Sequence, residues 1–414
     1  MTEFTLWGEK LPYCASRPQP KTLKHPDEPT VSTDGAVRAF GCDAASNAIG
    51  RYVHMKKSAV TLASACLGAA LMLVGTATFA NAQDNKVRWK MQSAFASTLN
   101  HLGPPALRFS KDIDRMSGGR FEIKFYEPGA LVPPLECFDA VSKGSIESCW
   151  TTPGYDTGKY PSLAFFTTVP FGPSFGEFLA WKWFGGGNQL RDEIYAKHGM
   201  VARDVSCIGP ETSGWFRKEV KSLEELKGMK MRFFGLGAQV MAKLGVSVQL
   251  LAAADIYPAL ERGVVDATEF SMPAMDIKLG FHQIAKYNYF PGWHQQVSCG
   301  HLLMNKAAWD KLPDHYKAMI EVAGQAQVSF NFAESEAGQF EVMAEMRDKH
   351  KVEVKRWDDT TLAAFEKAWL EVIAEESAKD ATFKKVADHY LDFRKKYAIW
   401  GTSQELKATY LKPN

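Results

Sequence analysis

Residues 87–150 decide the fold class, and they read VRWKMQSAFASTLNHLGPPALRFSKDIDRMSGGRFEIKFYEPGALVPPLECFDAVSKGSIESCW. Apolar and polar residues alternate over 87–91 and again over 121–126, a pattern typical of half-buried strands. A third strand is predicted over 146–150, where apolar residues again dominate.

The segments between these strands have the spacing of helices. Residues 105–116 form the first predicted helix, which we expect to end at Gly118 and Gly119. Residues 135–142 form the second. The order strand, helix, strand, helix, strand favours an α/β fold with a mostly parallel sheet and helices on its faces.

A second unit of the same kind follows. Strands are predicted over 230–234 and 264–270, with helices over 237–244 and 256–262. Two α/β units suggest two lobes, and such proteins bind ligands where strands end, in the crevice between lobes.

The C-terminal part of the chain is predicted to be helical. Residues 312–350 contain no proline after Pro313 and few glycines, which favours one helix of about 38 residues and about 57 Å that spans both lobes. Two further helices are expected over 361–378 and 381–396.

The N-terminus contains an export signal. Residues 55–82 combine Lys56 and Lys57, an apolar run and the cleavage site Ala-Asn-Ala, which together predict a signal peptide and a mature protein that begins at Gln83. Residues 1–54 are interpreted as an upstream extension from a start codon assigned too early. A membrane anchor and a genuine cytoplasmic extension are the alternatives.

Composition narrows the function classes. The chain has 414 residues, is 46% hydrophobic and carries a formal net charge of +2, which the two lysines of the signal peptide account for. The neutral mature chain has no electrostatic bias towards nucleic acid. Four cysteines remain after cleavage, namely Cys137, Cys149, Cys207 and Cys299. An oxidising compartment is compatible with disulfides between them and also with free thiols.

Several motifs occur in order along the mature chain. They are GALVP at 129–133, FFTTVPFG at 165–172, GWF at 214–216, ELKGMKMR at 225–232, DIYPALE at 255–261, VDATE at 265–269 and YFPGW at 289–293. On these motifs the chain resembles the solute-binding proteins of TRAP transporters, in particular the branch that binds 2-oxo monocarboxylates with a metal ion.

The resemblance implies a two-lobed, type II-like periplasmic binding protein with a ligand cleft between the lobes. Its expected limits are 83–208 for the first part of lobe 1, 209–297 for lobe 2, 298–350 for a return strand and the spanning helix, and 351–414 for the C-terminal helices. It further implies a periplasmic receptor, not an enzyme, that delivers a small carboxylate to a membrane permease. The branch also forms homodimers by exchanging a C-terminal helix.

The resemblance assigns a ligand site as well. Arg232, after the ELKG turn, corresponds to the residue that clamps the substrate carboxylate, and a guanidinium suits a carboxylate because it forms two parallel hydrogen bonds. Glu269 and the carbonyl of Phe270 correspond to metal ligands, although the branch usually has tryptophan at position 270. Glu211 stands where the branch has glutamine, as a further metal ligand near the substrate.

The extra charge of Glu211 bears on the ion. Two ionised carboxylates favour a divalent hard cation and therefore Ca²⁺ over Na⁺. The alternative is that Glu211 stays protonated or turns away, in which case Na⁺ is the expected ion. Trp150, Tyr155 and Trp293 are weaker substrate-binding candidates from loops or strand ends. His101 and His294 are interpreted as ordinary surface or loop residues.

Other functions remain as alternatives. A 2-hydroxy acid such as lactate would differ from a 2-oxo acid at one oxygen. A different class is an exported hydrolase that uses Glu211 and Glu269 as acid and base, but no nucleophile motif or phosphate loop supports an enzyme. A third reading is the ectodomain of a membrane sensor.

Overall fold

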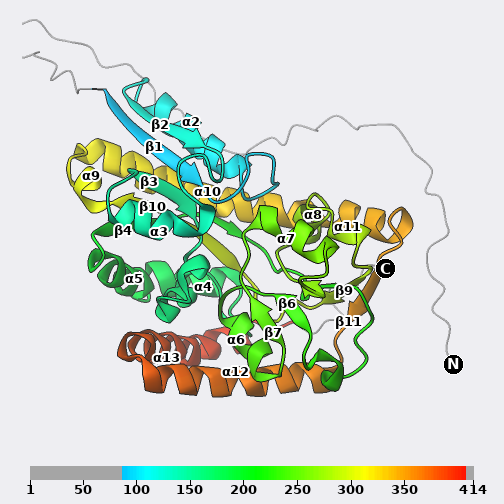
Figure 1. Cartoon of the computed structure of the whole chain (residues 1–414). Helices are drawn as coiled ribbons and strands as arrows, with labels where there is room; N and C mark the ends of the chain where they lie inside the picture. Colours follow the sequence, from blue (N-terminus) through cyan, green and yellow to red (C-terminus); the bar gives the residue numbers. More distant parts are fainter. Residues whose placement is uncertain (1–85, 407–414) are drawn as a thin grey trace, which may run out of the picture. The chain divides into compact units, whose positions relative to one another are not determined.

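The computed structural model describes residues 86–406, and the predictions made for residues 1–82 lie outside this range. The described chain forms two sheets with helices around them (Figure 1). The α/β prediction is therefore confirmed. Within residues 86–406, no helix has the length and hydropathy needed to cross a membrane.

The first sheet has the strand order β2-β1-β3-β10-β4. Strand β1 is parallel to β2 and β3, as predicted, whereas β10 is antiparallel to both β3 and β4. The sheet is mixed because β10 returns from the second sheet and enters in the opposite direction. The strands are β1 Val87–Ser93, β2 Phe121–Tyr126, β3 Ser148–Thr151, β4 Met200–Ile208 and β10 Ser298–Asn305.

Helices cover this sheet as their apolar spacing predicts. Helix α2 (Pro104–Met116) buries Ala106, Phe109 and Ile113, which repeat at helical spacing. The chain leaves α2 through Gly118 and Gly119, both with positive φ. The other helices of this part are α3 Cys137–Ser142, α4 Phe175–Trp183, α5 Gly187–Ala196 and α9 Lys306–Asp310.

The second sheet has the strand order β11-β9-β5-β8-β6-β7. Strand β6 is parallel to β7 and β8, and β5 is antiparallel to β8 and β9. The strand predicted over 264–270 is too long, because the amides of Val264 and Val265 still bond to Ala259 at the end of α7. The elements are β5 Gly214–Phe216, β6 Lys230–Arg232, α6 Gly235–Lys243, β7 Ser247–Gln249, α7 Ala253–Glu261, β8 Ala267–Thr268, α8 Pro273–Asp276, β9 Tyr287–Phe290 and β11 Glu353–Arg356.

The single long helix predicted over 312–350 is wrong. The structure has α10 (Asp314–Ala337) and α11 (Gln339–Asp348), separated at Gly338. Helix α10 packs on β4 and α2, whereas α11 packs on α8 beside the second sheet. The side chain of Gln339 fixes the break, since it donates to the carbonyl of Ser335 at 2.6 Å and accepts from the amide of Ala274 at 3.0 Å.

The last two helices lie against both parts of the molecule. Helix α12 (Asp359–Lys379) packs on α6, and α13 (Ala381–Ser403) packs on α12, on α4 and on the short helical turn Pro161–Phe166. Figure 1 shows α12 and α13 next to each other. The helices predicted over 361–378 and 381–396 are confirmed, and α13 extends further.

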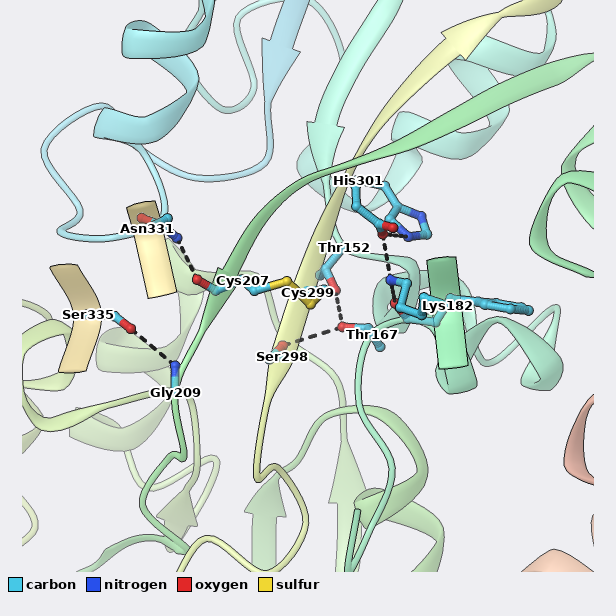
Figure 2. Close-up of a disulfide and its surroundings, with 12 residues drawn as sticks. Thr152, Thr167, Lys182, Cys207, Gly209, Ser298, Cys299, His301, Asn331 and Ser335 are labelled. Carbon is cyan, nitrogen blue, oxygen red and sulfur yellow. Dashed lines mark hydrogen bonds and ion pairs between the residues drawn. A yellow bond between two sulfur atoms is a disulfide. The ribbon is translucent and has the colours of Figure 1, made fainter. Parts of the chain in front are cut away.

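Both pairs of cysteines form disulfides, which answers the question that their spacing left open. Cys137 at the start of α3 bonds to Cys149 in β3, and Cys207 in β4 bonds to its cross-strand neighbour Cys299 in β10. The second bond lies where both strands leave the first sheet (Figure 2). Helix α10 contacts the chain next to this disulfide, because its residue Asn331 donates to the carbonyl of Cys207 at 3.0 Å.

Candidate functional site

A small cavity lies between the two sheets, next to the segments that connect them. Its volume is about 40 Å³, and since one water needs roughly 10–15 Å³ measured this way, it holds only a few water-sized groups. Residues from both sheets line it: Phe95, Leu102, Thr152, Tyr155, Ser206, Ile208, Glu211, Arg232, Phe234, Phe270, Ser271, Gln295, Ser298 and Gly300.

Arg232 is the only cationic side chain among the residues that line this cavity. It is the last residue of β6 and is 1% exposed. Its Nε donates to the carbonyl of Leu251 at 3.3 Å, and its Nη1 donates to Oε1 and to the carbonyl of Glu269, the former at 2.9 Å. Among the described residues, none accepts a hydrogen bond from Nη2, so this nitrogen is available to a ligand.

Glu269 follows β8 directly and is fully buried. Its Oε1 pairs with Arg232, while its Oε2 has no hydrogen-bond partner within residues 86–406. Burial opposes ionisation of this carboxyl, but the guanidinium of Arg232, together with His294 and the backbone of Phe234, holds the pKa of Glu269 below its usual range. Glu269 is therefore a carboxylate at neutral pH.

Glu211 comes from the segment that connects β4 to β5. Ser271 donates to its Oε1 at 3.2 Å, and its Oε2 has no partner in the described chain. Burial, and then the negative charge of Glu269, raise the pKa of Glu211 well above its usual range. Gly292 allows this arrangement, since a Cβ there would lie 2.1 Å from the carbonyl oxygen of Glu211.

His294 belongs to this site, although sequence reasoning interpreted it as a surface or loop residue. It lies in the segment that connects β9 to β10 and is 1% exposed. Its Nε2 is 3.6 Å from Oε2 of Glu269 and 3.8 Å from Oε2 of Glu211. The only signal in the sequence was its position directly after Trp293, which was not enough to predict burial.

These three side chains fit a metal ion. One ligand atom of each of Glu211, Glu269 and His294 lies within 4.8 Å of the other two. Oε2 of each glutamate and both nitrogens of His294 are buried without hydrogen-bond partners in the described chain. Buried polar atoms normally have partners, so atoms that converge without them indicate a place for a cation.

The other end of the cavity is apolar. Phe95, Leu102 and Phe234 line it, and the ring of Tyr155 lies edge-on to Phe234. The guanidinium carbon of Arg232 lies 5.2 Å from the centre of the Phe270 ring. The cavity therefore combines a charged end with an apolar wall, which suits a small anion that carries an alkyl group.

The structure places two of the predicted substrate-binding residues away from the cavity. The indole of Trp150 donates to the carbonyl of Leu102 and packs against Phe109 in the core. Trp293 packs between Phe171 and Phe365. Both indoles are buried in the core, and neither lines the cavity.

Asp276 lies behind the site and makes stability depend on pH. Its Oδ2 accepts from Nε1 of Trp215 at 2.8 Å, and burial raises the pKa of Asp276 to about 8. The folded protein thus holds this proton more tightly than the unfolded chain, so its stabilising effect is lost as pH rises through about 8. Asp276→Asn removes the titration.

We expect the free energy of unfolding of Asp276→Asn, relative to the unsubstituted protein, to rise by about 2 kcal/mol or more between pH 5 and pH 9. Urea titration at several pH values measures this difference. Exposed Asp114, changed to asparagine, is the matched control and should show no such trend. Parallel curves for the Asp276 variant and the unsubstituted protein would contradict the argument.

Comparison with known proteins places the chain among transport receptors. Residues 93–380 match the family described as bacterial extracellular solute-binding protein, family 7. A curated relative, a monocarboxylate 2-oxoacid-binding periplasmic protein of Nostoc sp., is 35% identical over 321 residues, which are 77% of this chain and 87% of the relative.

Solved structures agree with this match. A TRAP transporter solute-binding protein of Bordetella bronchiseptica, a mixed-occupancy dimer with calcium and picolinate, is 33% identical, has a TM-score of 0.75, and covers 77% of this chain and 95% of its own. A TRAP periplasmic solute-binding protein of Pseudoalteromonas atlantica with bound sodium and pyruvate is 30% identical, with a TM-score of 0.74 and coverage of 79% and 99%.

Proposed function

Since this chain belongs to family 7 of the bacterial extracellular solute-binding proteins and is a TRAP solute receptor, we propose that it captures a small 2-oxo monocarboxylate such as pyruvate together with a cation and delivers it to the membrane permease. Members of this family are transport receptors. The proposal therefore assigns Glu211 and Glu269 to binding and gives them no catalytic role.

The observation that carries the proposal is the charge of the cavity. Arg232 lines the cavity with Glu211 and pairs with Glu269 behind it, so with both glutamates ionised these three side chains carry one net negative charge, which repels an anionic ligand. A bound cation makes the net charge of the site positive. Arg232 can then pair with Glu269 and with the carboxylate of the ligand at the same time. The small volume and the apolar wall then favour a short alkyl group.

The roles of the residues follow from this arrangement. Glu211, Glu269 and the carbonyl of Phe270 would hold the cation, which supplies electrostatic attraction for the carboxylate and 2-oxo oxygens of the ligand. Nη2 of Arg232 donates to the carboxylate. Tyr155 also lines the cavity, and burial raises its pKa to about 12, so its hydroxyl stays a hydrogen-bond donor at neutral pH.

Calorimetric titration tests the ligand and the cation together. Pyruvate is titrated into chelator-treated protein with no added ion, with Na⁺ and with Ca²⁺. We expect binding to need a cation and Ca²⁺ to support it better than Na⁺, because two carboxylates attract a divalent ion more strongly. Lactate is the comparison ligand, and it should bind at least about tenfold more weakly because a hydroxyl is a poorer acceptor for the ion.

Mass spectrometry of ligand that co-purifies with the protein is the independent check. Equal pyruvate affinity in the presence and absence of ions would contradict the cation site, and tighter binding of lactate would change the ligand class.

The proposal extends to export and processing. Residues 55–82 would direct the chain to the periplasm and be removed before Gln83. Residues 1–54 would be absent from the protein that the cell produces. An extracytoplasmic location agrees with the family match. It also agrees with two disulfides in the described part of the chain, because disulfides persist in oxidising compartments.

A homodimer is the proposed assembly. Tyr390 in the first part of α13 is buried against Phe165 and Trp181 of the same chain, so the exposed end of α13 is the better candidate for a partner contact. There Ile399 is 77% and Trp400 is 60% exposed. Light scattering at micromolar concentration should give twice the chain mass, and Ile399→Asp with Trp400→Asp should give the single mass. A monomer mass for the unsubstituted protein would refute the dimer.

A further inference from the structure

Phe234 lines the apolar end of the cavity and comes from the second sheet. It follows Arg232 by two residues, lies directly before helix α6 and is 7% exposed. Its amide donates to the carboxylate of Glu269, so the backbone of Phe234 is tied to a residue of the proposed cation site. The position of the ring relative to the charged end of the cavity is therefore fixed by the backbone.

The ring of Phe234 lies against a turn that belongs to the other side of the cavity. This turn, Pro153–Asp156, follows β3 of the first sheet, and its Tyr155 ring centre is 5.7 Å from that of Phe234. Gly154 makes room for the ring, since a Cβ at this position would lie 2.0 Å from Cζ of Phe234. Gly154 does not have a positive φ, so the contact requires the missing side chain and not a special backbone conformation.

The turn that receives the ring is itself held in place. The amide of Gly154 donates to Oγ1 of Thr152 at 3.4 Å, and Thr157 donates to the carbonyl of Gly154 at 3.0 Å. Oγ1 of Thr152 lies 2.9 Å from Oγ1 of Thr167, a hydrogen bond that Figure 2 shows beside β10. Since the ring and the turn are both fixed, their contact depends on the distance between the two sheets.

We propose that Phe234, seated on Gly154, sets the longest alkyl chain that the receptor accepts, and that it selects pyruvate over longer and branched 2-oxo acids. The inference rests on the proposed function and names the residue that limits its ligand class. The cavity of about 40 Å³ holds about three or four water-sized groups, which matches the carboxylate, oxo and methyl groups of pyruvate. Further carbon atoms need the space that the ring occupies.

The same contact links chain length to closure of the cavity. Phe234 comes from the second sheet and Gly154 from the first, so a ligand that displaces the ring also separates the two sheets. The apolar groups of a ligand that fits are buried on both sides. A longer ligand loses part of this burial, because the two sheets no longer reach each other around it.

A ligand series tests the limit. Pyruvate, 2-oxobutyrate and 4-methyl-2-oxopentanoate are titrated calorimetrically into the unsubstituted protein and into Phe234→Ala, in buffer that contains both Na⁺ and Ca²⁺. We expect the unsubstituted protein to prefer pyruvate over the branched acid by about 100-fold, because small differences of fit in an apolar pocket change affinity by about 10- to 200-fold. Phe234→Ala should bind the branched acid at least about tenfold more tightly than the unsubstituted protein does, and pyruvate about tenfold more weakly.

The matched control is Phe184→Ala, since Phe184 is 89% exposed and does not line the cavity. This variant should keep the affinities and the order of preference of the unsubstituted protein.

A pair of substitutions tests the contact without enlarging the cavity. Gly154→Ala places a methyl group where the ring lies, so we expect pyruvate binding to weaken by about 20-fold. Leucine lacks the three ring atoms of Phe234 that this methyl group would meet. The double variant Gly154→Ala/Phe234→Leu should therefore bind pyruvate within about fivefold of Phe234→Leu alone.

Gly158→Ala is the control for this pair, because no atom of the described residues beyond its chain neighbours lies within 4 Å of a Cβ placed there. It should bind pyruvate normally. Circular dichroism melts show whether each variant is folded.

Two results would overturn the proposal. One is an unchanged order of preference for the three acids in folded Phe234→Ala, and the other is an equal loss from Gly154→Ala whether residue 234 is phenylalanine or leucine. Failure of the receptor function has a different signature, because the unsubstituted protein would then bind none of the three acids. If only the role of Phe234 is wrong, the unsubstituted protein still binds pyruvate.

Discussion

Replacing Arg232 by alanine is expected to weaken carboxylate binding by about 1,000-fold, which corresponds to about 4 kcal/mol. The variant loses the only cationic side chain among the residues that line the cavity and leaves Glu269, fully buried, without its ion-pair partner. A second buried negative charge then faces the incoming anion. Calorimetric titration of pyruvate in the presence of Ca²⁺ measures the loss.

Arg232→Lys separates charge from geometry. Lysine keeps the charge but cannot form two parallel hydrogen bonds, so we expect a loss of about 100-fold. Lys230, exposed on the same strand β6, is changed to alanine as the matched control and should bind normally. If the lysine variant bound pyruvate as tightly as the unsubstituted protein, another group would have to hold the carboxylate.

Replacing Asp204 by asparagine is expected to lower the free energy of unfolding by about 3–5 kcal/mol. Asp204 in β4 forms buried ion pairs with Lys182 and with Arg191, the second at 3.2 Å. His301 lies 3.1 Å from the same carboxylate, and burial lowers its pKa to about 4, so it is neutral at neutral pH. The substitution keeps the shape of the side chain but leaves buried Lys182 without an anionic partner and leaves Arg191 with Asp192 alone.

Asp192 provides the control, because its carboxylate contacts the same Arg191 at 2.8 Å from a side chain that is 47% exposed. Asp192→Asn should cost less than about 1 kcal/mol.

Burial opposes ionisation of Asp204, but Lys182 and Arg191 hold its pKa well below the usual range. The stabilisation is therefore present above about pH 4 and is lost as pH falls below it. Urea titration of both variants at pH 7 and pH 3 measures these losses of unfolding free energy. Equal losses for the two variants at pH 7 would contradict the prediction.

Local patterns in the sequence predicted many elements well. The strand over 121–126 agrees at both ends, and the helix predicted over 105–116 differs from α2 by one residue. These segments succeed because one face of each is buried and the other is exposed, so the period of the apolar residues is visible. The bounds of the short strand β8 were predicted less well, because it is buried on both faces and its apolar residues show no such period.

The break between α10 and α11 depends on contacts that are distant in sequence. Gly338 alone is only a weak stop signal, since a glycine inside a helix costs about 1 kcal/mol. The side chain of Gln339 bonds to Ala274 at the start of α8, 65 residues earlier in the chain. No local pattern contains that contact.

The sequence by itself determined the family and the α/β class, because the motifs occur in the family's order and spacing. It also predicted Arg232, Glu211 and Glu269 as site residues, since Arg232 and Glu269 lie inside such motifs and Glu211 lies just before GWF at 214–216. Only the tertiary structure decided that His294 joins the two glutamates and that Trp150 and Trp293 belong to the core. The reason is physical. The site is formed where the segment before β5, the end of β8 and the segment before β10 meet, and Gly292 lets two of them approach within contact of the backbone. Such proximity depends on how the two sheets pack, and the spacing of residues along the chain carries no record of it.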